Sequence, residues 1–174
     1  MAKSILLSSF ILFCVSIAES SILSNINFLF VIPDFVLICS VYFSLLNGKT
    51  IGVTSGFISG LYLDFITGVP FGFNCLIRTI IGYVYGFFSE TLIATGFIMP
   101  MFTVGIATIV KHLLIHVVSL LFPNVSVLVT SFVSYEFLFE FIVNSLLSPF
   151  VFKFLGLFRN TLSVITTKDK MNNA

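Results

Sequence analysis

The feature that most constrains this chain is a series of six apolar segments, each of about the length that a transmembrane helix needs, roughly 20 residues. Turn residues bound most of these segments. Only 9% of the 174 residues are charged, too few to cover a water-facing surface, since soluble domains carry about 25%. The sequence therefore predicts an all-α integral membrane protein with six transmembrane helices, at residues 4–20, 28–46, 51–67, 73–89, 100–122 and 126–150.

Prolines are expected to mark the ends of two of these helices, because proline lacks the backbone N–H that a helix interior needs. Pro100 would open the fifth helix and Pro123 would close it, while Pro149 would close the sixth.

Two stretches are predicted to lie outside the transmembrane helices. A continuous helix over 91–122 would be about 48 Å long, which exceeds the thickness of a bilayer. Residues 91–99 are therefore expected to form a loop, an interfacial turn or a kinked extension. The tail at 159–174 is polar and is expected in the cytoplasm, which leaves one six-span domain at residues 1–158.

The first 20 residues allow two interpretations. Lys3, an apolar stretch and a small residue at Ala18 form the pattern of a cleavable signal peptide. The apolar stretch from Ile5 to Ala18 is long for a signal peptide, however, and the rest of the chain is also predicted to be membrane-embedded. A retained first helix is the favoured interpretation.

The distribution of lysine and arginine predicts the orientation. Cytoplasmic loops are enriched in these residues, and the connections near 20–27, 68–72 and 123–125 contain none. With six spans, both termini are therefore expected in the cytoplasm, whereas five spans would divide the basic residues between two sides. The basic residues on the predicted cytoplasmic side are Lys3, Lys49, Lys153, Arg159, Lys168 and Lys170.

Small residues recur at a spacing of four in the third segment, and glycine also recurs at Gly82 and Gly86 in the fourth. Glycine costs roughly 1 kcal/mol against alanine in a soluble helix, but in lipid it lets helix backbones approach closely. The repeat predicts a helix face about 140° wide, which would pack within this chain or against a partner's transmembrane helix. The face consists of Gly52, Ser55, Gly56, Ser59 and Gly60.

Most charged residues inside the predicted helices sort into two clusters of similar depth when neighbouring helices are folded about their connecting turns. A charge in a membrane is costly and usually has a partner or a function. Structural ion pairing and a polar cavity or ion path are both consistent with these clusters. The clusters are Asp34, Asp64 and Arg78, and Lys111, Glu136 and Glu140.

Two histidines and a polar stripe accompany the second cluster, but no reacting centre is evident. His112 and His116 lie one helical turn apart, without the HExxH pattern of a zinc site. The three cysteines lie in apolar runs with no CxxC spacing. Neither a nucleophile elbow nor a phosphate-binding loop occurs, so we expect no enzyme activity, metal or cofactor. The stripe, at a spacing of four, is Glu136, Glu140, Asn144 and Ser148.

The segment 33–87 resembles the rod shape-determining protein MreD family of bacteria. Residues 91–174 match that family only as a generic hydrophobic half, so the resemblance assigns no residue roles there. The resemblance rests on Pro33–Asp34 at the start of a span, the pattern Gly56-Phe57-x-x-Gly60-Leu61-x-x-Asp64, then Gly68, Gly72 and the pair Gly82–Tyr83.

The resemblance implies a non-catalytic scaffold in the bacterial inner membrane. MreD-like proteins act in cell shape and lateral peptidoglycan synthesis with the bitopic protein MreC, the actin-like MreB, the glycosyltransferase RodA and its partner transpeptidase. The resemblance also implies a fold similar to the six-helix substrate-binding subunits of energy-coupling-factor vitamin transporters. This likeness leaves an alternative function, a small-molecule-binding membrane subunit with an outward-facing pocket. A phospholipid-processing enzyme is disfavoured because its motif is missing.

Overall fold

The computed structural model describes residues 2–25, 33–89, 96–121 and 134–163, which form α-helices and turns with no β-strand among them. The helices are α1 (Ala2–Asn25), α2 (Phe35–Asn47), α3 (Lys49–Thr67), α4 (Phe73–Phe87), α5 (Ile98–Leu121), α6 (Tyr135–Gly156) and the short α7 (Arg159–Leu162).

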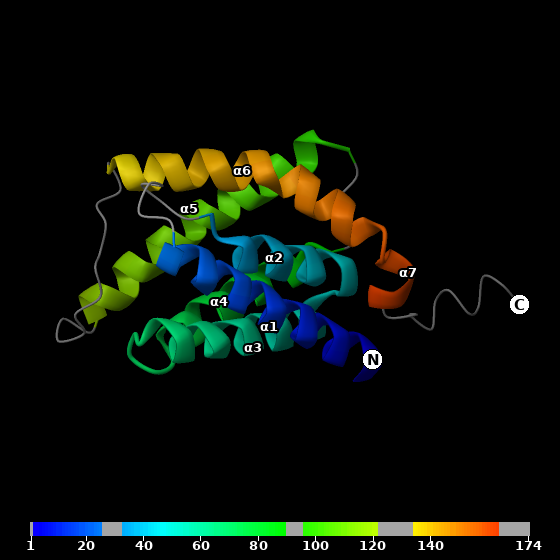
Figure 1. Cartoon of the computed structure of the whole chain (residues 1–174), viewed down its shortest axis with the longest axis horizontal. Helices are drawn as coiled ribbons and strands as arrows, with labels where there is room; N and C mark the ends of the chain where they lie inside the picture. Colours follow the sequence, from blue (N-terminus) through cyan, green and yellow to red (C-terminus); the bar gives the residue numbers. More distant parts are fainter. Residues whose placement is uncertain (1, 26–32, 90–95, 122–133, 164–174) are drawn as a thin grey trace, which may run out of the picture.

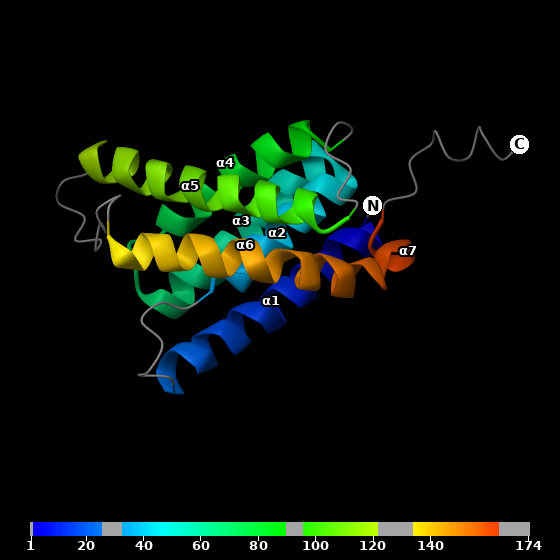
Figure 2. The ribbon, with the colours of Figure 1, turned by 90° about the horizontal axis from the view of Figure 1, so that it is seen from above.

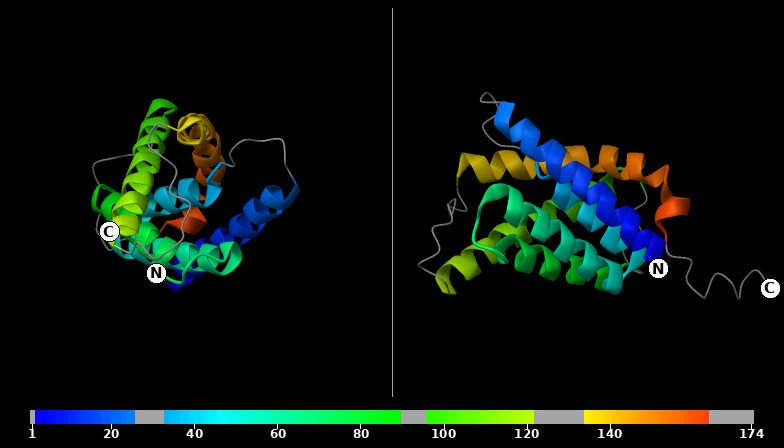
Figure 3. Two further views of the ribbon diagram at one scale, coloured as in Figure 1. Left: turned by 90° about the vertical axis from the view of Figure 1, so that its left-hand side faces the viewer. Right: turned by 60° about the horizontal axis from the view of Figure 1, so that its bottom comes forward.

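The first six helices run alternately up and down one axis (Figures 1 and 2). The N-terminus, the turn between α2 and α3, the end of α6 and the whole of α7 lie at one end of the bundle. The turn between α3 and α4 lies at the opposite end. Figure 3 shows α1 crossing the bundle obliquely, where it contacts α2 and α3.

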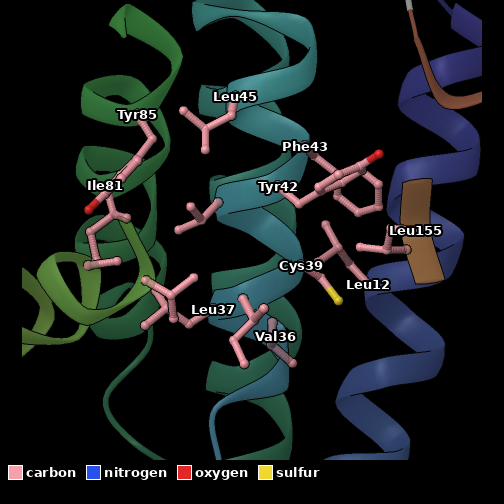
Figure 4. Packing of buried hydrophobic residues seen from close by; sticks show 14 of the residues in the cluster. Leu12, Val36, Leu37, Cys39, Tyr42, Phe43, Leu45, Ile81, Tyr85 and Leu155 are labelled. Atoms are coloured by element: carbon pink, nitrogen blue, oxygen red, sulfur yellow. The ribbon is translucent and has the colours of Figure 1, made fainter. Parts of the chain in front are cut away.

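Helix α2 forms the centre of the bundle. All residues from Val36 to Leu45 are buried, and Figure 4 shows α2 between α4 on one side and α1 on the other. A helix that is apolar around its whole circumference is stable only when other helices surround it. Fully buried Leu12 of α1 and Ile81 of α4 pack into the same core.

The outward faces of the surrounding helices are apolar. Two helices of the described residues, Ile98–Leu120 within α5 and Tyr135–Gly156 in α6, are long and apolar enough to cross a membrane. Shorter apolar stretches occur at Ile5–Ser21 and Phe35–Asn47. A membrane location is thus supported by α5 and α6, and the count of six spans stays a prediction. Exposed apolar side chains include Leu6, Phe10, Phe13 and Ile17 on α1 and Leu138, Ile142, Leu146 and Phe150 on α6.

Each of the six predicted segments overlaps one observed helix. Helix α5 begins at Ile98, so Pro100 lies in its first turn, where the N–H that proline lacks needs no helical partner. Of the stretch 91–99, predicted as a loop, an interfacial turn or a kinked extension, residues 96 and 97 form a turn, residues 98 and 99 belong to α5, and residues 91–95 lie outside the described residues. Also outside the described residues are Pro123, the starts of the second and sixth predicted segments, and most of the tail.

The prediction that Pro149 ends the sixth helix is wrong, because α6 continues to Gly156. Proline at position 149 cannot donate to the carbonyl of Ser145, four residues earlier. The hydroxyl of Ser148 donates to that carbonyl instead, at 2.8 Å. Such side-chain replacements are what allow proline inside membrane helices.

Candidate functional site

The candidate site is built around Asp34, which begins the central helix. The carboxylate of Asp34 caps α2 by accepting the N–H of Leu37 at 2.7 Å. The N–H of Asp34 itself donates to the side-chain oxygen of Asn144 on α6, at 2.9 Å. The start of α2 is thereby tied to α6, although 110 residues separate the two in the sequence.

Two cations from different helices converge on the Asp34 carboxylate. One guanidinium nitrogen of Arg78, on α4, donates to both carboxylate oxygens at 2.7 and 2.8 Å. The ammonium of Lys111, on α5, donates to one of them at 2.9 Å. Asp34 and Arg78 are 5% and 3% exposed, so these charges interact with each other and not with solvent.

Lys111 extends the network to α6. Its ammonium also pairs with the carboxylate of Glu140, whose second oxygen lies 3.0 Å from Nε2 of His112. The amide of Asn144 donates to the hydroxyl of Thr108 at 3.3 Å. Helices α5 and α6 are therefore joined by polar side chains along one buried seam.

Two members of each predicted cluster form one network, because Lys111 bridges Asp34 and Glu140. Two carboxylates face one guanidinium and one ammonium, so the formal charges of these four groups cancel. Burying an uncompensated charge would be prohibitive, whereas a paired and hydrogen-bonded set can stay buried. This arrangement supports the interpretation of structural ion pairing. One nitrogen of Arg78, Nη1, is buried without a protein partner among the described residues.

Although the sequence places Asp64 in one cluster with Arg78, these two side chains do not pair in the structure. Its carboxylate accepts the N–H groups of Gly72, Asn74 and Cys75, at 2.9, 2.9 and 3.3 Å. Helix α4 begins after Gly72, which has no side chain to cap it. Asp64 therefore caps α4 from the neighbouring helix and satisfies N–H groups that lack helical partners.

Glu136 also lies outside the network. It is exposed in the first turn of α6, and the described part of the chain contains no ion pair between it and Lys111. The cation pairs with Glu140 instead, one turn further along α6. His116 is half-buried on α5, one turn beyond His112. Ser148 is buried, and its hydroxyl replaces the N–H that Pro149 lacks, as described above.

Sequence reasoning missed Glu19. It is half-buried on α1, and its carboxylate accepts the N–H of Val36 in the first turn of α2, at 3.1 Å. An acidic residue within the first apolar segment was the available signal, because an acid there needs a partner.

The glycine face of α3 packs inside this chain. A Cβ added to Gly52, Gly56 or Gly60 would come under 3.0 Å from backbone atoms of α4. Gly82 of α4 meets Gly52 directly, so the two backbones touch there. The hydroxyls of Ser55 and Ser59, which complete this face, are buried and donate to carbonyls of their own helix. In this structure the glycine face therefore packs within the chain, where α4 covers it.

Taken together, the fold and site define a small helical membrane protein with an apolar exterior, whose main interior charges neutralise one another. Among the described residues, no group of three or more His, Cys, Asp or Glu is placed to hold a metal ion. The family model described as rod shape-determining protein MreD matches residues 2–158. The chain therefore belongs to the MreD family, as the sequence resemblance predicted. No curated protein and no solved structure matches it.

Proposed function

We propose that the protein is a non-catalytic scaffold of the cell-wall elongation machinery, which holds an MreC-like bitopic protein in the bacterial inner membrane. The observation that carries this proposal is the family match, which covers nearly the whole helical bundle, residues 2–158. MreB, RodA and its transpeptidase would be indirect partners. The neutralised interior supports a structural role, because its carboxylates are engaged with cations and helix ends and do not face an open reaction site.

The proposed topology has six spans and both termini in the cytoplasm. The described basic residues outside the buried network, Lys3, Lys49, Lys153 and Arg159, all belong to segments at the same end of the bundle. The positive-inside tendency places that end in the cytoplasm. Reporter fusions at Ala174 and near Asn124 test the topology, and reporters on the same side would contradict it.

The partner's transmembrane helix must bind an outward face, because the glycine face of α3 is covered by α4. Such association in lipid relies on van der Waals packing, since apolar burial alone gives little drive there. Exposed apolar side chains occur on α1, α3, α4, α5 and α6, so the outward surfaces of these helices are available. The small-molecule-binding alternative needs an outward-facing polar pocket, whereas the buried charges of Asp34, Arg78, Lys111 and Glu140 are paired with one another.

Co-purification tests the scaffold proposal. The full chain, expressed with the MreC-like protein of the same genome, should retain that protein through detergent extraction and size-exclusion chromatography. An unrelated bitopic membrane protein expressed at the same level is the control. Depleting this chain in its own host should also turn rods into rounded cells. Failure to retain the MreC-like protein when both proteins are inserted and monodisperse would reject the binding proposal.

A further inference from the structure

Gly156 is the one glycine in this chain that neither close packing nor backbone conformation explains. It is the last residue of α6 and is exposed, its φ is not positive, and an added Cβ would meet nothing within 4 Å. Glycine in a helix is less stable than alanine by roughly 0.5–1 kcal/mol. The other ten glycines either meet a neighbouring helix, at Gly52, Gly56, Gly60, Gly82, Gly86 and Gly105, or have positive φ, at Gly48, Gly68, Gly72 and Gly96.

The space beside Gly156 is part of a cleft of about 320 Å³. The cleft lies between the start of α5 and the end of α6, which Figures 1 and 2 show side by side. Its volume falls at the small end of the range for ligand sites, about 300–1,000 Å³. Gly96, whose added Cβ would likewise meet nothing within 4 Å, also lines the cleft. Its lining residues are Gly96, Phe97, Pro149, Phe152, Lys153 and Gly156.

The lining combines one cation with aromatic walls. Lys153 is exposed, and no described carboxylate pairs with its ammonium. Phe97 and buried Phe152 form apolar walls, and Phe97 makes an edge contact with Phe150, with ring centroids 6.4 Å apart. A ligand with an anionic head and an apolar body matches this combination.

The cleft also lies where such a ligand occurs. Among the described residues, α5 and α6 are long and apolar enough to cross a membrane, so in the proposed topology their adjoining ends lie at a bilayer surface. All described carboxylates belong to the opposite half of the bundle, near the ends of α1 and α3 or the starts of α2 and α6. The described charged side chains at the cleft end are basic: Lys49, Lys153 and Arg159.

We propose that this cleft binds one anionic phospholipid from the leaflet at the basic end of the bundle. The lipid phosphate would lie against the ammonium of Lys153, and the upper acyl chains would pack against Phe97 and Phe152. Basic residues at a membrane surface attract anionic lipids, and lysine can keep its charge in the headgroup region while its stem lies on apolar surface. Gly96 and Gly156 supply the room for the lipid.

Native mass spectrometry of the full chain in detergent, with phosphatidylglycerol or phosphatidylcholine added, tests the proposal. The wild type should retain one phosphatidylglycerol in preference to phosphatidylcholine. Lys153→Gln should weaken that binding about fivefold, the effect of one surface charge, and Lys153→Arg should restore it. Lys49→Gln is the matched control, because that ammonium lies outside the cleft, 4.2 Å from the ring centroid of Phe87. The control should bind as the wild type does.

A substitution that fills the cleft tests whether lipid binding needs the shape of the cleft as well as the charge of Lys153. Gly156→Leu should reduce phosphatidylglycerol binding at least tenfold without lowering the melting temperature of the lipid-free protein, because the added side chain enters open space. Gly156→Ala, with one added methyl group, should give a smaller loss. Wild-type binding by Gly156→Leu, equal binding of phosphatidylcholine, or equal weakening by Lys49→Gln would overturn the proposal. Displacement of the lipid by millimolar inorganic phosphate would assign the cleft to a free anion and would also overturn it.

Discussion

Helices α3 and α4 meet through their backbones, whereas helices α5 and α6 meet through their side chains. At Gly52 and Gly82 the two backbones of the first pair leave no space for a Cβ. In the second pair, Lys111 pairs with Glu140 and Asn144 bonds Thr108. Even the glycine of that interface, Gly105, would place a Cβ against side-chain atoms only. The first contact depends on shape, and the second depends on keeping every polar partner.

Helix α2 connects these two interfaces through Asp34. Its carboxylate pairs with Arg78 from the first pair of helices and with Lys111 from the second. Ion pairs therefore hold the central helix from both sides, and they fix its position along the bundle axis as well as its packing. We call α3 and α4 the glycine-packed half, and α5 and α6 the side-chain-packed half. We expect these two halves to respond differently to the same kind of substitution.

The largest effect is expected where the two halves meet, at Asp34. Asp34→Ala removes the shared partner of Arg78 and Lys111 and the cap of α2. Removing one partner of a buried ion pair costs about 3–5 kcal/mol, so the variant should be poorly folded. The chain contains no tryptophan, but a thiol-reactive dye can follow unfolding in a Cys14→Ser background, since Cys39 and Cys75 are buried and Cys14 is exposed.

The control for Asp34→Ala is Arg78→Ala in the same background. Combining the two substitutions should destabilise less than the sum of the single effects, because the pair is lost only once. Additive effects would mean that the two side chains do not interact, and the connection between the halves would then be wrong.

The next effect separates the two interfaces by a matched substitution. Gly56→Ala places a Cβ against the backbone of α4 at Arg78, and neither helix can yield without moving its neighbour. Overpacking costs about 1–3 kcal/mol, and we expect the upper end. Gly105→Ala places its Cβ 3.0 Å from the Ser145 hydroxyl and 3.1 Å from the Phe141 ring. Those side chains can rotate, so the cost should stay below about 1 kcal/mol.

Monodispersity on size-exclusion chromatography and the thiol-dye melting temperature measure both glycine variants. Equal losses at Gly56 and Gly105 would contradict the contrast between backbone and side-chain packing. A stable Gly56→Ala protein would mean that the face of α3 is not closed by α4.

The helices of this fold could be predicted from apolar segments and turn residues, and the glycine repeat correctly marked a close helix contact. The partners of the charges could not all be derived. Folding hairpins about their turns predicts the depth of a residue but not the side of the helix from which it projects, so Asp64 was matched with Arg78. The cross-bundle pairing of Asp34 with Lys111 needs the three-dimensional arrangement. Pro149 was misread because the rule that proline ends a helix ignores local replacement of the missing N–H, here by the hydroxyl of Ser148 within the same helix.

A smaller effect tests whether the carboxylate of Asp64, in the glycine-packed half, acts as the cap of α4. Asp64→Ala should cost about 0.5–2 kcal/mol, the usual loss of a helix cap, since it frees the N–H groups of Gly72, Asn74 and Cys75. Asp64→Asn, which keeps one acceptor oxygen, should recover part of this loss in the thiol-dye assay. Because Arg78 bonds Asp34, combining Asp64→Ala with Arg78→Ala should give additive losses. Strongly non-additive losses would mean that Asp64 and Arg78 do interact.

The smallest effect concerns Ser148 in the side-chain-packed half. Ser148→Ala leaves the carbonyl of Ser145 without the hydroxyl that replaces the missing N–H of Pro149, and we expect a loss of about 1 kcal/mol. Ser16→Ala on α1 is the matched control, because the Ser16 hydroxyl also donates to a helix carbonyl, that of Leu12 at 2.7 Å. No proline removes the helical N–H from that carbonyl, so the control should lose only a few tenths of a kcal/mol. In a Pro149→Ala background the helical N–H returns, and Ser148→Ala should then be nearly neutral in the thiol-dye melt. An unchanged loss in that background would show that Ser148 stabilises α6 by packing and not by replacing the hydrogen bond.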